Sequence, residues 1–198
     1  MVPPLLCGGA LWNTPLKAAG GRSTTVLASY VTGGVTCAAA AAFGSGKDPI
    51  PAPPWRIERD DMGVDASAPT GTPIYATAPS TLAQVIGDWF EGEPLLLFKF
   101  DTPQTGTPYG DQYWYLAEQI IPVTTTIGTT FATGQAVAHY APAGTGIEIG
   151  WGSPTSNQRT LAGQEGDAAA ANPGAGQTTQ WGETFKRYFG IKPLGVSP

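Results

Sequence analysis

The chain contains little charge, a single histidine and only two cysteines. Charged residues make up 13% of its 198 residues, and the formal net charge is −5. The longest basic cluster is the adjacent pair Lys186 and Arg187, which gives a phosphate backbone nothing to bind. The composition therefore predicts that nucleic acid is not a partner.

Long apolar runs are also missing. No window approaches eighteen uninterrupted apolar residues, and the opening stretch MVPPLLCGGALWN lacks the basic segment and the continuous apolar core of a signal peptide. We therefore expect neither a membrane span nor an export signal.

The two cysteines, Cys7 and Cys37, lie in the same N-terminal segment. They do not form a C-x-x-C pair, which excludes a metal knuckle. Free buried thiols are the favoured interpretation, and a disulfide is the alternative.

Glycine and proline, in contrast, are abundant, with 27 and 19 copies, so turns should be frequent and long helices few. Short β-prone runs bounded by glycine, proline or aspartate follow one another between residues 56 and 152. They predict a mainly β fold, a small antiparallel domain. The runs are TPIYATA, TLAQVIGDWF, PLLLFKF, QYWYLAEQIIPV, GQAVAHYA and GIEIGWG.

Four segments follow from these changes in composition. Residues 1–54 form an extended apolar arm rich in glycine and proline, which ends in the stiff spacer PIPAPPW and is expected to gain order on another surface; a flexible tail is the alternative. Residues 55–152 form the β domain. Residues 153–177 are expected to be a polar linker with nothing to place in a core, and residues 178–198 to be a helix and tail.

The C-terminal stretch TTQWGETFKRYFG predicts a short amphipathic helix, with Thr179 as N-cap and Gly190 at its end. Its aromatic residues recur at helical spacing, so one face should be apolar. We expect this face to dock on the β domain. The alternative is that it contacts another subunit through Trp181, Phe185 and Phe189.

The stretch DMGVDASAPTGTPIYATAPSTLAQV, from residue 61, resembles the lysostaphin-type (LytM-like) zinc endopeptidases, whose cores run H-x-G-x-D and then A-P-x-G-T-P-V-x-A. Further along, YWYL resembles the family's Y-x-H-L, GTTFATGQAVA its G-x-x-V-x-x-G-Q-x-I, and GIEIGW its H-x-H strand. The resemblance covers roughly residues 58–152. It implies a lysostaphin-like β domain with a narrow antiparallel sheet.

In that family, zinc is held by the first histidine, the aspartate and the last histidine, and the other histidines handle protons. Carried over by motif, the first ligand is Asp61 and the second is Asp65. The H-x-H pair becomes Gly146 and Glu148, and the Y-x-H-L histidine becomes Tyr115. Every family histidine is therefore replaced.

These replacements predict a pseudoenzyme without zinc. Gly146 has no side chain to move a proton, and Tyr115 is a poor base at neutral pH. General acid–base catalysis is worth roughly two to four orders of magnitude, and loss of nitrogen ligands weakens zinc binding. The chain's one histidine, His139, falls on no motif position. Residual endopeptidase activity with a carboxylate-bound metal is the alternative.

Three carboxylates, those of Asp61, Asp65 and Glu148, would share the old pocket. Like charges at that range must be protonated, separated or bridged by a cation. The favoured interpretation is that these residues bond locally or lie in water, with Glu148 pointing away from the pocket; the alternative is a bound hard cation, for which Ca²⁺ or Mg²⁺ is chemically apt. We expect Asp60 to face solvent, because only Asp61 satisfies the motif spacing.

The sequence thus predicts a structural or adaptor component of a phage tail, such as a tail tip or baseplate. It would be made in the host cytoplasm and would be oligomeric in the virion, with neighbours bound through the arm and the C-terminal helix. The alternative is a peptidoglycan-binding module that uses exposed Trp114 or Trp151, although tryptophans in small β domains usually lie in the core.

Overall fold

The computed structural model describes residues 46–104, 112–141, 146–164 and 180–192. The chain divides into two units, Met1–Phe43 and Gly44–Pro198, and every described residue belongs to the second. Cys7, Cys37 and Thr179 lie outside the described residues, so the expectations for the thiols, the arm up to residue 45 and the helix cap stay predictions. None of the helices in the described ranges is long and apolar enough to cross a membrane.

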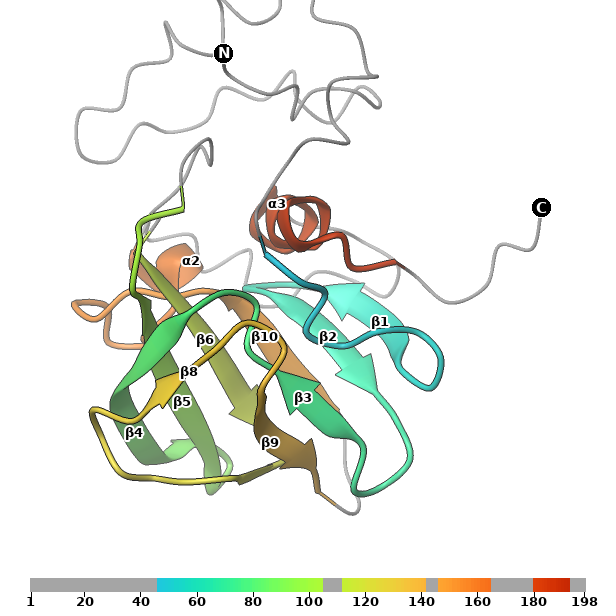
Figure 1. Ribbon diagram of the computed structural model, residues 1–198, viewed down its shortest axis with the longest axis horizontal. Helices are drawn as coiled ribbons and strands as arrows, with labels where there is room; N and C mark the ends of the chain where they lie inside the picture. The colour runs from blue at the N-terminus through green and yellow to red at the C-terminus, as the bar shows by residue number, and fades with distance from the viewer. Residues whose placement is uncertain (1–45, 105–111, 142–145, 165–179, 193–198) are drawn as a thin grey trace, which may run out of the picture. The chain divides into compact units, whose positions relative to one another are not determined.

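Two antiparallel sheets make up most of the described chain (Figure 1), which confirms the prediction of a mainly β fold. The larger sheet runs in the order β1 (Arg56–Asp60), β2 (Val64–Ser67), β10 (Ile147–Trp151), β6 (Tyr113–Glu118), β5 (Glu93–Phe100), β4 (Ser80–Phe90) and β8 (Thr130–Phe131). The smaller sheet runs in the order β3 (Pro73–Tyr75), β9 (Ala136–Tyr140) and β7 (Ile120–Pro122). The helices among the described residues are α2 (Leu161–Gln164) and α3 (Gln180–Phe189).

The hairpin of β4 and β5 shows how local sequence sets this architecture. Its turn consists of Glu91 and Gly92, both with positive φ (49° and 86°), and Phe90 pairs with Glu93. Two consecutive residues in this conformation are typical of a type I′ turn, whose twist matches that of the strands. The run of three leucines in β5 is buried on both faces of the sheet, so its apolar residues need not alternate with polar ones.

One face of the large sheet carries the aromatic core and α3. Trp151 of β10 contacts the rings of Phe185, Tyr188 and Phe189 with centroid separations of 5.1–5.6 Å. Its Nε1 donates to Thr184 Oγ1 at 3.2 Å. In Figure 1, α3 (red) lies beside β1 and β2, with which it is in contact. The helix therefore docks on the β domain, as expected.

This docking buries the aromatic residues that the sequence offered for a second subunit. Trp181, Phe185 and Phe189 are each at most 3% exposed. Gly190, with φ of +71°, follows the last helical residue in the left-handed conformation that commonly ends a helix. The described part of the chain therefore leaves these three side chains no exposed aromatic face.

The expectation of a linker without core residues is wrong for residues 153–164. Leu161 and Ala162 are buried in α2, and Thr160 forms a β-bridge with Gly152. Short polar side chains can be buried when they bond locally, as Thr160 Oγ1 does by accepting from Gly163 N at 3.0 Å. Residues 165–177 lie outside the described residues.

The proline-rich spacer also packs against the domain. Ile50 and Trp55 are each 1% exposed. The Trp55 Nε1 donates to the Pro73 carbonyl at 3.3 Å, and its ring meets Tyr140 edge-on at 5.6 Å. The segment therefore contributes to the core.

Candidate functional site

A row of cross-strand partners places the predicted site on the face of the large sheet opposite Trp151. Arg59 of β1 pairs with Asp65 of β2, Asp65 with Glu148 of β10, and Glu148 with Ala117 of β6. The row continues to Leu95 of β5. Because directly paired residues point to the same face of a sheet, these side chains form one line that is charged at one end and apolar at the other.

Asp61 joins this row from the turn that follows β1. One carboxylate oxygen from each of Asp61, Asp65 and Glu148 lies within 4.8 Å of the other two, and all three residues are buried. These are the three positions that the sequence motif relates to metal ligands. Glu148 therefore lies at the cluster, and the interpretation in which it points away is wrong.

The glycine of the motif is required by the packing of this turn. A Cβ on Gly63 would lie 2.5 Å from the Ile149 carbonyl oxygen and 2.6 Å from the Tyr115 hydroxyl. A Cβ on Gly150 would meet Gly63 Cα at 2.9 Å. Both glycines leave room for the Tyr115 ring, which fixes the turn against β10 and β6.

Tyr115, at a position of a family histidine, is fully buried and donates its hydroxyl hydrogen to Glu148 Oε1. Burial, followed by the charge of Glu148, raises the pKa of Tyr115 well above its usual value. Burial and the charges of Asp61 and Asp65 likewise raise the pKa of Glu148 well above the usual range. Tyr115 therefore keeps its proton at neutral pH and cannot act as a general base.

Arg59 is a cation at the cluster that the sequence reasoning missed. Its Nη2 lies 3.0 Å from Asp61 Oδ2, and its Nε donates to Asp65 Oδ2. Burial and the charge of Asp61 raise the pKa of Asp65 to about 7, even though Arg59 acts to lower it. The spacing of these residues in the sequence could have indicated the contact, because a hairpin at the turn after β1 places Arg59 opposite Asp65.

Glu118 is a further carboxyl group missed in the sequence. It is 8% exposed at the end of β6. Burial, and then the charges of Asp65 and Asp61, raise the pKa of Glu118 to about 8. The charges of Asp61 and Asp65 therefore act on a carboxyl group beyond the three motif residues.

Gly146 and His139 offer the cluster no nitrogen ligand. The φ of Gly146 is +130°, and a Cβ there would lie 2.9 Å from the Ala66 carbonyl oxygen, so a histidine at this position would be strained. His139 lies in the smaller sheet, paired with Pro73 and Ile121.

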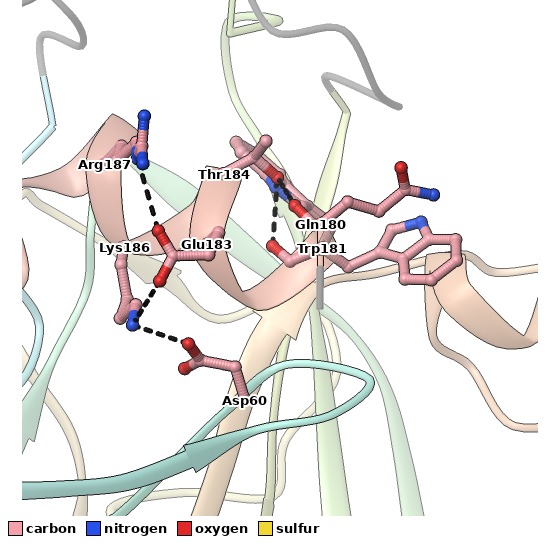
Figure 2. Close-up of polar contacts among 8 residues, drawn as sticks. Asp60, Gln180, Trp181, Glu183, Thr184, Lys186 and Arg187 are labelled. Atoms are coloured by element: carbon pink, nitrogen blue, oxygen red, sulfur yellow. Dashed lines mark hydrogen bonds and ion pairs between the residues drawn. The ribbon is translucent and has the colours of Figure 1, made fainter. Parts of the chain in front are cut away.

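The expectation that Asp60 faces solvent is wrong, because Asp60 is 1% exposed. Its Oδ2 lies 2.5 Å from Lys186 Nζ, which also pairs with Glu183 at 2.7 Å (Figure 2). Alternation along β1 turns Asp60 to the face opposite Arg59, where α3 covers it. Gly182 permits this close approach, since a Cβ there would collide with the Asp60 side chain. Burial, partly offset by Lys186, raises the pKa of Asp60 to about 6.

Trp114 and Trp151 are both fully buried. Trp114 stacks on Phe98 with a centroid separation of 4.1 Å, and its Nε1 donates to Ser80 Oγ at 3.1 Å. The core interpretation of these tryptophans is therefore correct, and neither offers an exposed ring to a ligand.

A catalytic zinc of the peptidase type does not fit these residues. Such zinc sites hold the metal through protein ligands that include histidine and keep one position open for water. The cluster supplies carboxylates alone, while the chain's one histidine lies in the other sheet. Arg59 already pairs with two of the three carboxylates.

No protein-family model and no curated protein matches the chain. Among solved structures, it is similar to a zinc-containing peptidase from Vibrio cholerae, with 16% identity and a TM-score of 0.41 over 55% of this chain and 36% of that chain. It is also similar to a candidate M23 peptidase from Pseudomonas aeruginosa, with 15% identity and a TM-score of 0.38 over 68% of this chain and 56% of that chain. The chain thus spans less than two thirds of either protein, and similarity at this level says nothing about activity.

Proposed function

We propose that this chain is a lysostaphin-like domain that no longer hydrolyses peptide bonds and serves as a structural component of a larger assembly. One observation carries this proposal. The motif positions meet in a buried cluster where two carboxylates and a tyrosine stand in place of histidines, and Arg59 pairs with the carboxylates of Asp61 and Asp65. What remains of the motif, such as Gly63, holds the fold together.

The chemistry of hydrolysis supports loss of activity. A metallopeptidase must polarise a water molecule and pass a proton to the leaving amine. Tyr115 binds its proton too tightly to act as a base, and Glu148 accepts the hydrogen bond from it. Gly146 has no side chain to contribute. Loss of general acid–base catalysis alone lowers the rate roughly 10²- to 10⁴-fold.

The structural role extends the expectation drawn from residues 1–54 and from the chemistry of the site. A phage tail or a comparable virion part is the assembly that we propose. Exposed apolar side chains in and after the edge strand β7, those of Ile121, Val123 and Ile127, are in keeping with contact to a neighbour. The buried Trp114 and Trp151 give no support to the alternative of a wall-binding module.

Incubation of the purified full chain with peptidoglycan sacculi tests the loss of activity. The buffers contain Zn²⁺, Ca²⁺ or EDTA, and mass spectrometry of the supernatant detects released peptides. We expect no release in any buffer and no difference between the wild type and Asp65→Ala. Zinc-dependent release that disappears in Asp65→Ala would overturn the proposal. Protein that pellets with sacculi without releasing peptides would favour the wall-binding alternative.

A further inference from the structure

We infer that the Arg59 guanidinium occupies the place of a metal cation in the cluster of Asp61, Asp65 and Glu148, and that these carboxylates bind a hard divalent cation once Arg59 is removed. The inference deepens the proposed function and rests on it, since it names the residue that closes the former metal site.

The contacts of Arg59 are those expected of a bridging cation. Its Nη2 reaches Asp61 at 3.0 Å while its Nε reaches Asp65, so one side chain joins two carboxylates. A guanidinium presents its donors in a rigid planar fork, which suits it for this role better than the single ammonium of lysine. The side chain of Arg59 is 42% exposed, whereas those of Asp61 and Asp65 are 3% and 8% exposed. The positive charge therefore enters a buried acidic site from its rim.

The turn after β1 places Arg59 in this position, because Asp60 pairs with Val64 and Arg59 with Asp65 in regular succession from the turn. Ile57 pairs with Ala66 and Arg59 with Asp65, so β1 has one residue more than β2 between these pairs. Glu58 is this extra residue and has no pair in β2. In the bulged strand, Glu58 instead accepts a hydrogen bond from Ser67 Oγ. Bulges commonly re-aim a side chain in this way.

Oxygen atoms remain for a metal ion if Arg59 is taken away. The three carboxylates each supply an oxygen within 4.8 Å of the others. Asp65 Oδ1 is buried without a hydrogen-bond partner. Carboxylate oxygens are the preferred ligands of Ca²⁺ and related hard ions. Removal of Arg59 would leave buried negative charge that such an ion can compensate.

Terbium luminescence of the full chain tests the inference, because Tb³⁺ is a hard ion of calcium-like size that aromatic side chains sensitise. Tyr115 bonds directly to Glu148 and would lie next to a bound ion. We expect Arg59→Gln to bind Tb³⁺ at least about tenfold more tightly than the wild type, because a competing charge is lost. Ca²⁺ should compete for the site and raise the Tm of Arg59→Gln but not that of the wild type.

Two variants serve as controls. Arg56→Gln removes an exposed arginine from the same strand, and it should bind Tb³⁺ no better than the wild type. Arg59→Lys keeps a positive charge and should bind more weakly than Arg59→Gln. Equal binding by the wild type and Arg59→Gln, or equal gains in Arg56→Gln and Arg59→Gln, would overturn the inference.

The inference also predicts what happens if Arg59→Gln fails to fold in EDTA. Either added Ca²⁺ or the second change Asp65→Asn should then restore the wild-type far-ultraviolet circular dichroism, because each lowers the uncompensated charge. If neither restores it, Arg59 has a role other than charge balance and the inference is wrong. Peptide release by the wild type would instead contradict the proposed function, whatever the terbium result.

Discussion

Two adjacent aspartates are buried on opposite faces of the large sheet, and the charge of each is compensated in a different way. Asp60 turns toward α3 and pairs with Lys186 of that helix, which also packs Phe185 against Trp151. Asp61 turns toward Asp65 and Glu148 and shares Arg59 with Asp65. The α3 face thus has a cation for its buried aspartate and also carries the ring contacts of Trp151, whereas the cluster face has more buried carboxylates than its arginine can neutralise. Stability should therefore depend mainly on the first face, and response to cations and pH mainly on the second.

Truncation of the aromatic contact on the α3 face should have the largest effect. Phe185 is fully buried against Trp151, and a Phe→Ala change in a core typically costs about 3–5 kcal/mol. We expect Phe185→Ala to lower the free energy of unfolding by that amount in guanidinium titrations. Phe90→Ala is the matched control, because Phe90 is 50% exposed and should change stability by less than about 1 kcal/mol. Similar losses in both variants would show that α3 is not anchored by this contact.

Removal of the Lys186 charge, which neutralises Asp60, should have the second largest effect on stability. Breaking a buried ion pair by removing one partner typically costs about 3–5 kcal/mol, and we expect the lower end for Lys186→Met because Lys186 is also partly exposed. The loss should shrink when Asp60→Asn is added, since the buried charge is then gone. Urea titrations of the two single variants and the double variant at pH 8 measure this coupling. Strictly additive losses would contradict the pairing.

Addition of a methyl group at Gly63, in the turn after β1, should lower the stability by less than the two changes above. Gly63→Ala forces a contact with the Ile149 carbonyl oxygen and with Tyr115, and overpacking of this kind costs about 1–3 kcal/mol. Gly87→Ala is the control, because a Cβ on this β4 glycine meets nothing within 4 Å and should leave stability unchanged or slightly raised. Thermal unfolding of both variants distinguishes them. Equal Tm values would show that the turn after β1 can accommodate a Cβ at residue 63.

The smallest effect that we expect is on the pH dependence of stability, through Glu118 on the cluster face. The pKa of Glu118 is raised from 4.5 to about 8, so the folded chain holds this proton more tightly than the unfolded chain. The contribution of Glu118 to stability is therefore greatest below about pH 4.5 and falls as pH rises toward 8. Glu118→Gln should remove this fall and be more stable than the wild type at pH 8, by on the order of 1 kcal/mol after solvent screening.

Urea unfolding at pH 5, 6.5 and 8 measures the effect, with Glu91→Gln in the exposed β4–β5 turn as control. Parallel pH profiles for the wild type and Glu118→Gln would show that the pKa of Glu118 is not raised in the folded chain.

Local sequence patterns predicted much of the fold. The β-rich runs, the turn residues and the aromatic spacing of the C-terminal helix reflect interactions between near neighbours, and the structure has strands and a helix in these places. The motif also predicted that Asp61, Asp65 and Glu148 meet, because the fold that it implies brings these distant positions together.

Long-range pairing explains what the sequence could not predict. The role of Arg59 depends on the pairing register set by the turn after β1, and one residue of register decides whether Glu58 or Arg59 stands opposite Asp65. Asp60 is buried only because a helix more than a hundred residues later covers it. Residues 153–164 pack through small polar groups that bond locally, which composition alone cannot distinguish from an exposed linker.

We expect that the cluster of Asp61, Asp65 and Glu148 does not hold a catalytic zinc ion, and the zinc content of the protein tests this expectation. The purified full chain is incubated with excess Zn²⁺, desalted and measured by inductively coupled plasma mass spectrometry, next to Asp65→Ala. We predict far less than one zinc ion per chain and no difference between the two proteins. One zinc ion per wild-type chain that survives desalting and is lost in Asp65→Ala would show that the cluster is a zinc site.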